Sequence, residues 1–426
     1  MKFAGRDVAS GGKPRSTSGD REERMMRRIS ACLLAGLATL PAFAQDARPL
    51  RIAILEDMSG VYSDLNGPGA VVAGQLAIED FGGTVLGRKI ELLSADHQNK
   101  ADIGAATARR WLESEGVEMI TGLGNSSVGL AVRGIAHSLK KIDINTSAGS
   151  SDLTGKACSP TGFHWVYNTY AASKTVGAAT VRAGADSTFF VAADYSFGHA
   201  LARDGARFVE EAGGKVLGTI RAPLNTADFS SYILQAQNSK AKNIGLALAG
   251  QDLVNFIKQA SEFGIQRQGQ SLSAFIAFIS DIKALGLNTT QGLFLPEAFY
   301  WDLNDDTRAF AKRFHERRKA MPNGMQSGIY SAITHYLKAV KAEGSADAEK
   351  VAARMRATPI NDFFSRDVRI RADGRVIRDF HLFQVKKPAD SKGDWDLLTR
   401  VQTLKGEEAF QPLAGSECPL VAQAGK

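Results

Sequence analysis

Short apolar runs alternate with amphipathic stretches along most of the chain, starting near Pro49. Near-continuous apolar runs indicate strands buried on both faces, and apolar positions recurring roughly every three or four residues indicate helices that cover them. We expect strands over residues 51–55, 89–94, 117–121 and 141–145, separated by helices over 68–81, 101–114 and 126–137. This order predicts an α/β fold around a parallel sheet.

The alternation stops in a stretch rich in Ser, Gly and Thr, residues 146–161, and then restarts. Beyond it we expect strands over 163–167, 187–193, 215–221, 243–249 and 271–275, and helices over 171–183, 198–212, 229–237 and 253–263. An extended segment over 291–299 and helices over 305–319 and 325–342 follow, and Asp373-Gly374 predicts a hairpin between 367–371 and 378–385. The sequence therefore predicts two doubly wound parallel-sheet lobes, for which 426 residues suffice.

The first 44 residues read as an N-terminal extension followed by an export signal. Two arginines precede an apolar run over residues 29–40, and an A-x-A sequence follows at 42–44. This arrangement is typical of a secretory signal peptide. A transmembrane anchor is the alternative, but a bilayer requires roughly 20 apolar residues. We expect translation from Met25 or Met26, cleavage near Ala44 and a periplasmic mature protein.

Charge and composition narrow the class of protein. The formal net charge is +7, but much of the excess lies within the first 44 residues, so it does not indicate nucleic-acid binding. A content of 44% hydrophobic and 23% charged residues is that of an ordinary soluble protein and excludes a disordered chain.

Two cysteines remain after removal of the signal, Cys158 and Cys418. An even pair in an oxidising compartment predicts a disulfide. The histidines show no ligand spacing with these cysteines or with each other, so we expect no metal site and no cofactor.

Several segments, in the same order along the chain, resemble the branched-chain amino-acid class of periplasmic binding proteins (the leucine/isoleucine/valine-binding family). The matching blocks are Ala53-Ile54-Leu55, Met58-Ser59-Gly60, Leu76-Ala77-Ile78-Glu79-Asp80, Gly122-Leu123-Gly124-Asn125-Ser126-Ser127, Asp194-Tyr195-Ser196-Phe197-Gly198, Asp228-Phe229-Ser230 and Phe263-Gly264-Ile265. The resemblance implies a solute-capturing subunit of an ABC importer. Its partners would be a small-molecule ligand and a permease in the inner membrane.

The resemblance also implies the type I periplasmic binding protein fold, in which three crossovers form the hinge between the lobes. On this reading residues 49–164 plus about 297–362 form lobe 1, residues 165–296 plus about 363–405 form lobe 2, and 406–426 form a C-terminal tail. We expect a monomer.

Loops at the carboxyl ends of the predicted strands are the candidate ligand site, because open parallel sheets bind ligands there. Ser126 and Ser127 open a helix directly after a strand, which suits a ligand carboxylate, although both serines are also ordinary helix N-caps. The candidate ligand-binding residues are Tyr62, Leu65, Asn125, Ser126, Ser127, Ser147, Ala148, Gly149, Ser150, Tyr195, Phe197, Asp252, Phe275, Phe299 and Tyr300.

The absence of an acidic residue near Phe275 bears on the class of ligand. The family pairs the ligand's ammonium group with an acidic residue near Phe275, but this chain has Phe275 and Phe278 there and no carboxylate. A buried ammonium without a partner is costly. We therefore favour a small aromatic or apolar acid over a branched-chain amino acid, unless Asp252 replaces the missing acid. A periplasmic ligand-sensing protein, such as an amide sensor, is a further alternative.

Catalytic motifs do not support an enzyme. The sequence contains no G-x-S-x-G, no Walker lysine motif and no H-E-x-x-H. Gly122-x-Gly124-x-x-Ser127 nearly matches a dinucleotide fingerprint, but its third position is Ser and it does not follow the first strand. We expect a binding protein without catalytic residues.

Overall fold

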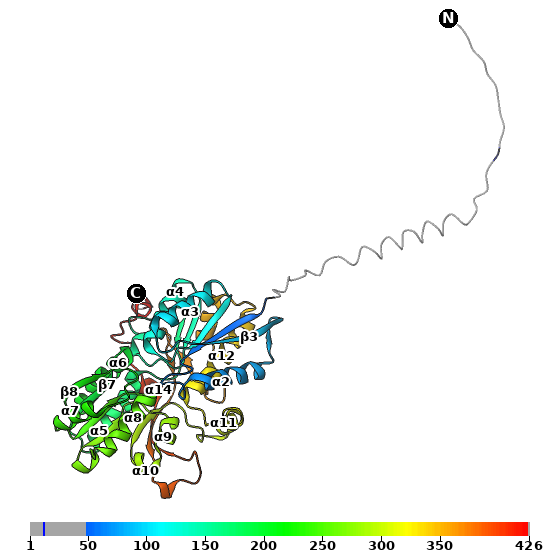
Figure 1. Cartoon of the computed structure of the whole chain (residues 1–426). Helices are drawn as coiled ribbons and strands as arrows, with labels where there is room; N and C mark the ends of the chain where they lie inside the picture. The colour runs from blue at the N-terminus through cyan, green and yellow to red at the C-terminus, as the bar shows by residue number, and fades with distance from the viewer. Residues whose placement is uncertain (1–11, 13–47, 425–426) are drawn as a thin grey trace, which may run out of the picture. The chain divides into compact units, whose positions relative to one another are not determined.

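The computed structural model describes residue 12 and residues 48–424. The predicted signal peptide and its cleavage position at Ala44 lie outside the described residues. Residues 48–424 belong to one compact unit (Figure 1). Within the part of the chain that the structure describes, no helix is long and apolar enough to cross a membrane.

The first sheet has six strands in the order β2-β3-β1-β4-β5-β6. Its strands are β1 (Leu50–Glu56), β2 (Thr84–Val85), β3 (Arg88–Asp96), β4 (Val117–Gly122), β5 (Ile142–Asn145) and β6 (Gly162–His164). All neighbours are parallel except β2 and β3. Strand β1 is apolar at successive positions because both faces are covered: Ile52 and Ile54 pack in one cluster, and Ala53 and Leu55 in another.

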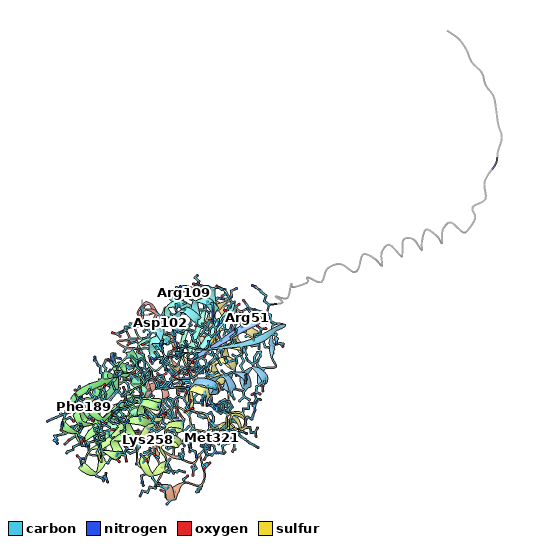
Figure 2. All side chains as sticks on the ribbon, viewed as in Figure 1. Arg51, Asp102, Arg109, Phe189, Lys258 and Met321 are labelled. Atoms are coloured by element: carbon cyan, nitrogen blue, oxygen red, sulfur yellow. A yellow bond between two sulfur atoms is a disulfide. The ribbon has the colours of Figure 1, made fainter. Side chains whose placement is uncertain are left out.

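Helices cover both faces of this sheet. Helix α2 (Gly67–Phe81) packs with α12 (Gly324–Glu343) and α11 (Asp305–Arg318), and α3 (Ala101–Glu113) packs with α4 (Ser126–Ser138). Exposed side chains such as Arg109 of α3 project from the outer surface of these helices (Figure 2). The amphipathic pattern of the sequence reflects this arrangement.

The second sheet has four parallel strands in the order β10-β9-β7-β8. They are β7 (Ser187–Ala193), β8 (Lys215–Ala222), β9 (Asn243–Ala247) and β10 (Ser271–Ala274). Helices α5 (Thr169–Arg182) and α6 (Ser196–Glu211) lie against Phe190 of β7 on one face. Helices α7 (Ser230–Asn238) and α8 (Gly250–Glu262) lie against Val191 on the other. Two parallel sheets covered on both faces confirm the predicted fold class.

A third, antiparallel sheet adds to the second lobe, and here the sequence-based prediction is partly wrong. Strand β14 (Phe380–Val385) pairs with β11 (Phe294–Glu297) and β15 (Leu398–Leu404). The hairpin around Asp373-Gly374 is shorter than predicted, because it consists of β12 (Arg369–Ile370) and β13 (Val376–Ile377). The remaining helices are α9 (Ile279–Leu285), α10 (Leu287–Thr290), α13 (Ala348–Ala357), α14 (Gly406–Ala409) and α15 (Pro419–Ala424), with 3-10 turns at Ser151–Thr154, Gln266–Gln268 and Pro388–Asp390.

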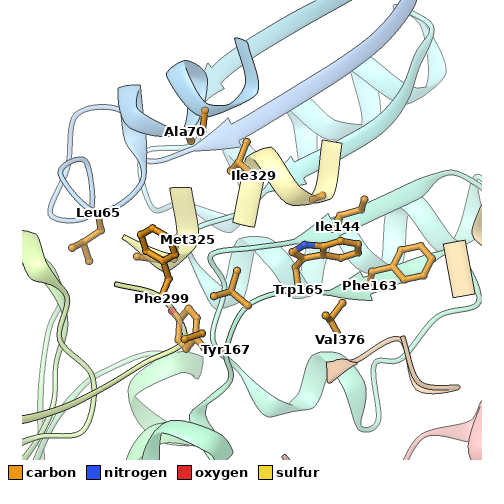
Figure 3. Close-up of a cluster of buried hydrophobic side chains, with 14 of the residues drawn as sticks. Leu65, Ala70, Ile144, Phe163, Trp165, Tyr167, Phe299, Met325, Ile329 and Val376 are labelled. Atoms are coloured by element: carbon orange, nitrogen blue, oxygen red, sulfur yellow. The ribbon is translucent and has the colours of Figure 1, made fainter. Parts of the chain in front are cut away.

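The chain passes between the two lobes three times: after β6, after β11, and before β14. Trp165, in the first passage, is fully buried and donates its indole N–H to Ser331 Oγ of α12 at 3.0 Å. It lies in an apolar cluster with Phe163 and Ile329 (Figure 3). Arg378 of the third passage donates to the carbonyl of Trp165 at 3.1 Å, so the passages are tied to each other.

The predicted disulfide is present. Cys158, in the loop before β6, is bonded to Cys418, just before α15, with a Cα–Cα distance of 5.6 Å. The bond fixes the C-terminal segment to the first lobe.

Candidate functional site

A small, nearly filled cavity lies at the carboxyl ends of the parallel strands and has about 10 Å³ of free space. The first lobe contributes Tyr62, Leu65, Asn66, Gly124, Ser126, Ser147, Gly149 and Met325, the second contributes Tyr195, Phe197, Ala249 and Phe278, and the first passage between the lobes contributes Tyr167. Because both lobes contribute lining residues, a ligand in this cavity would contact both lobes at once.

The polar end of the cavity is the N-terminus of α4. Ser126 is its first residue, and the side chain of Asn125 caps the helix by accepting the N–H groups of Ser127 and Val128. Ser126 Oγ accepts hydrogen bonds from the N–H groups of Gly149 at 3.2 Å and Ser150 at 3.1 Å. Its own hydroxyl proton is therefore free to donate, and the positive end of the helix dipole favours an anion at this position.

The apolar end is built from aromatic rings. Tyr167 and Phe278 meet edge to face with ring centroids 5.9 Å apart, and Tyr195 lies 6.0 Å from Phe197. Tyr167 donates its hydroxyl to the carbonyl of Ser147 at 2.8 Å, which fixes the ring against the first lobe. These rings offer flat apolar surfaces to a ligand.

The lobes touch each other around the cavity, so the structure is the closed arrangement. The hydroxyls of Tyr62 and Tyr195 are hydrogen-bonded at 2.8 Å, and Ser127 Oγ lies 3.0 Å from Ser196 Oγ. Burial raises the pKa of both tyrosines well above their ordinary value, so both hydroxyls stay protonated. One of their two protons joins the pair, which leaves the other available to a ligand.

Ionised side chains are absent from the lining within the described residues. One acid lies directly behind it: Glu56, at the end of β1, accepts hydrogen bonds from Ser147 Oγ at 2.7 Å and from the N–H of Gly124 at 2.8 Å. Burial, as the largest cause, raises the pKa of Glu56 to about 8. The cavity is therefore uncharged at neutral pH.

Seven candidate residues from the sequence lie in this lining: Tyr62, Leu65, Ser126, Ser147, Gly149, Tyr195 and Phe197. Four others are neighbours with bonds of their own. Asn125 is the N-cap of α4, and the hydroxyl of Ser127 is hydrogen-bonded to Ser196 of the second lobe. The carbonyl of Ala148 accepts a hydrogen bond from His164 Nε2 at 2.7 Å, and the N–H of Ser150 donates to Ser126 Oγ. The helix cap is thus Asn125 and not the serines that follow it.

The last four candidates lie elsewhere, which corrects their predicted place in the site. Phe275 packs on Phe190 at 5.0 Å inside the second lobe, and Phe299 packs on Phe363 and Phe364. Tyr300 donates its hydroxyl to the carbonyl of Trp395 at 3.1 Å. Asp252 is buried, accepts the N–H of Asn225 at 3.1 Å, and does not line the cavity.

Sequence reasoning missed Asn66, Gly124, Tyr167, Ala249 and Met325 as lining residues. Tyr167 and Met325 belong to the hinge and to α12, which approach the cavity only after the chain has folded back. The reason for a glycine at position 124 is visible only in the structure, because a Cβ there would lie 2.4 Å from Glu56 Oε2. Phe278, assigned to the second-lobe loop from the sequence, does line the cavity.

A cavity between two parallel-sheet lobes, lined by hydrogen-bond donors and aromatic rings, is typical of a solute-binding protein. The sequence profile of the periplasmic binding protein family matches residues 49–394. The chain belongs to this family, whose members bind solutes outside the cytoplasm and are not enzymes. This confirms the resemblance seen in the sequence.

Solved structures agree with this assignment. A periplasmic binding protein from Burkholderia mallei is 45% identical, covers 88% of this chain and 99% of its own, and superposes with a TM-score of 0.86. A branched chain amino acid ABC transporter periplasmic ligand-binding protein from Burkholderia xenovorans is 39% identical over 87% of this chain and 100% of its own, with a TM-score of 0.77. At 20% identity, a solute binding protein of an ABC transporter from R. palustris, in complex with benzoate, shares the type I fold, with a TM-score of 0.76 over 84% of this chain and 97% of its own.

Proposed function

We propose that this protein is the periplasmic solute-binding subunit of an ABC importer and that it captures a small aromatic carboxylate. The observation that carries the proposal is the cavity itself: five aromatic rings line it together with the first residue of α4, and the described lining residues include no ionised group. Closure of the lobes on the ligand would present the closed form to a permease in the inner membrane. The ABC-transporter context of the B. xenovorans relative supports the permease.

The walls of the cavity favour a flat ligand. In this closed arrangement only about 10 Å³ of the cavity is free, roughly enough for one water molecule, so the lining has to move apart to admit an aromatic acid. The rings of Tyr167, Phe197 and Phe278 suit an aromatic ring, and each such contact contributes roughly 0.5–1.5 kcal/mol beyond the buried area.

The donors favour a carboxylate. Ser126 has a free hydroxyl proton at the positive end of α4, and the Tyr62–Tyr195 pair has a second. Hydrogen bonds to a charged group contribute roughly 1.5–3 kcal/mol each, enough for neutral donors to hold an anion.

A branched-chain amino acid is the second candidate. The name of the B. xenovorans relative favours it, and so does the side chain of Asn66. Asn66 lines the cavity, and its buried Oδ1 has no hydrogen-bond partner among the described residues, so it would accept from an ammonium group or equally from a ligand hydroxyl. An ammonium ion also needs a countercharge. Asp252 does not supply it here, because it is bonded to Asn225 outside the lining.

Calorimetric titration with benzoate, 4-hydroxybenzoate, phenylpropanoate, leucine and valine tests the proposal. We expect an aromatic acid to bind and the two amino acids not to bind. Replacing Ser126→Ala should weaken binding roughly ten- to a hundredfold, whereas Ser138→Ala, at the other end of α4, should leave affinity unchanged. Tight leucine binding that Asp252→Asn abolishes, without any response to aromatic acids, contradicts the proposal. The genomic neighbours distinguish an importer from a periplasmic sensor.

A further inference from the structure

We propose that Glu56 is a positioning residue that works in its protonated form, turning the hydroxyl of Ser147 into a donor for the ligand's carboxylate. The inference rests on the proposed carboxylate ligand. It assigns a role to an acid that lies behind the cavity and not in its lining.

The surroundings of Glu56 form a close-fitting site for a carboxyl group. The side chain is fully buried, with Oε1 2.7 Å from Ser147 Oγ and Oε2 2.8 Å from the N–H of Gly124. A Cβ at Gly122 or Gly124 would lie 2.6 or 2.4 Å from a carboxyl oxygen of Glu56. The two glycines therefore allow the backbone to approach the carboxyl group, and Ser147 connects it to the cavity.

The protonation state of Glu56 decides what Ser147 offers to a ligand. If the carboxyl is ionised, Ser147 donates its proton to Oε1 and presents lone pairs to the cavity, which repel an anion. When Glu56 is protonated, the proton sits on Oε1 and donates to Ser147 Oγ, because Oε2 already accepts from the N–H of Gly124. In that state the proton of Ser147 no longer points to Glu56. It can turn to Thr146 Oγ1, 3.2 Å away, or join Ser126 as a donor to the carboxylate of a bound ligand.

The neighbours of Glu56 favour the neutral form. Burial and, to a smaller extent, the charge of Asp57, next along the chain, together raise its pKa to about 8. His97, whose N–H donates to the carbonyl of Glu56 at 3.0 Å, is uncharged at neutral pH, because burial lowers its pKa to about 4. Asp96, beside His97, is bonded to Ser59 and to the N–H of Met58. The residues closest to the carboxyl group are uncharged: Gly122 at the end of β4, Asn66 before α2 and Ser147 after β5.

Binding should therefore depend on pH in a defined direction. Since the ionised form loses the donor from Ser147, affinity is constant well below pH 8, falls as the pH rises through about 8, and levels off roughly ten- to a hundredfold lower, which corresponds to one lost hydrogen bond to a charged group. At about pH 8, binding should also take up about half a proton, because half of the free protein is ionised there.

Calorimetry should measure benzoate affinity in the wild-type protein and two variants from roughly pH 6 to 9.5, a range that brackets the titration of Glu56. In Glu56→Gln the amide can donate to Ser147 and accept from Gly124 at every pH, so affinity should no longer fall at high pH. Glu297→Gln is the matched control, because Glu297 is another buried acid whose pKa is raised to about 8 and which bonds to Ala298 and Gly324 outside the lining. It should keep the wild-type profile.

An infrared difference spectrum of the ligand-free protein, wild type minus Glu56→Gln, provides a readout that does not need a ligand. We expect a neutral carboxyl band at pH 7 that disappears as the pH rises through about 8. Absence of that band, or a Glu56→Gln profile that falls like the wild type, overturns the role of Glu56. If the band is present but no aromatic acid binds at any pH, the proposed ligand class fails, and the positioning role fails with it.

Discussion

Gly250 is the residue at which the main chain of one lobe meets the main chain of the other. Its φ is +57°, and a Cβ there would lie 2.3 Å from the carbonyl oxygen of Val61 and 2.9 Å from the ring of Tyr62. The next N–H, from Gln251, donates to that same carbonyl at 3.0 Å. Closure of the lobes thus depends on a position without a side chain.

Replacing Gly250→Ala should weaken ligand binding by about tenfold or more, because the added methyl group disfavours the closed arrangement that the ligand selects. Gly213→Ala is the control: its φ is +88° and a Cβ there would contact nothing within 4 Å. Both variants carry the left-handed backbone cost of about 1–2 kcal/mol in unfolding free energy. Equal loss of affinity in the two variants, measured by calorimetry, contradicts a role of Gly250 in closure.

At the scale of elements, the sequence predicts the parallel sheets well and the antiparallel one poorly. The parallel strands are buried on both faces, so β1 and β9 are apolar at nearly every position and stand out. Strand β15 has only one end buried and reads LTRVQTL, a pattern that also suits a loop. The Asp373-Gly374 turn has a clear local signal and joins β12 to β13, but the next strand, β14, pairs with distant segments, β11 and β15.

For the candidate site, too, the sequence predicts best the residues that directly follow parallel strands. Ser126 and Gly149 follow neighbouring parallel strands, so their convergence is a consequence of the sheet. The second-lobe loop was harder: Phe275 packs into the lobe on Phe190, and Phe278, three positions on at the start of α9, faces the cavity. The direction of such side chains depends on the path of the loop, which has no periodic signal.

For the molecule as a whole, the Cys158–Cys418 disulfide closes a loop with a sequence separation of 260. In the chain-entropy description, its loss costs at most about 5 kcal/mol of unfolding free energy. We expect the double variant Cys158→Ser/Cys418→Ser to unfold at a clearly lower urea concentration while keeping its ligand affinity, because neither cysteine lines the cavity. Full labelling of both thiols in unreduced, denatured protein rules the bond out.

The central claim, that an aromatic carboxylate is enclosed between the two lobes, is tested most directly by anomalous scattering from crystals grown with 4-bromobenzoate. We expect one bromine peak inside the cavity, among the rings of Tyr195, Phe197 and Phe278, with the carboxylate beside Ser126 at the N-terminus of α4. A cavity without a bromine peak at a ligand concentration that saturates the protein in solution contradicts it, as does a carboxylate that lies away from Ser126.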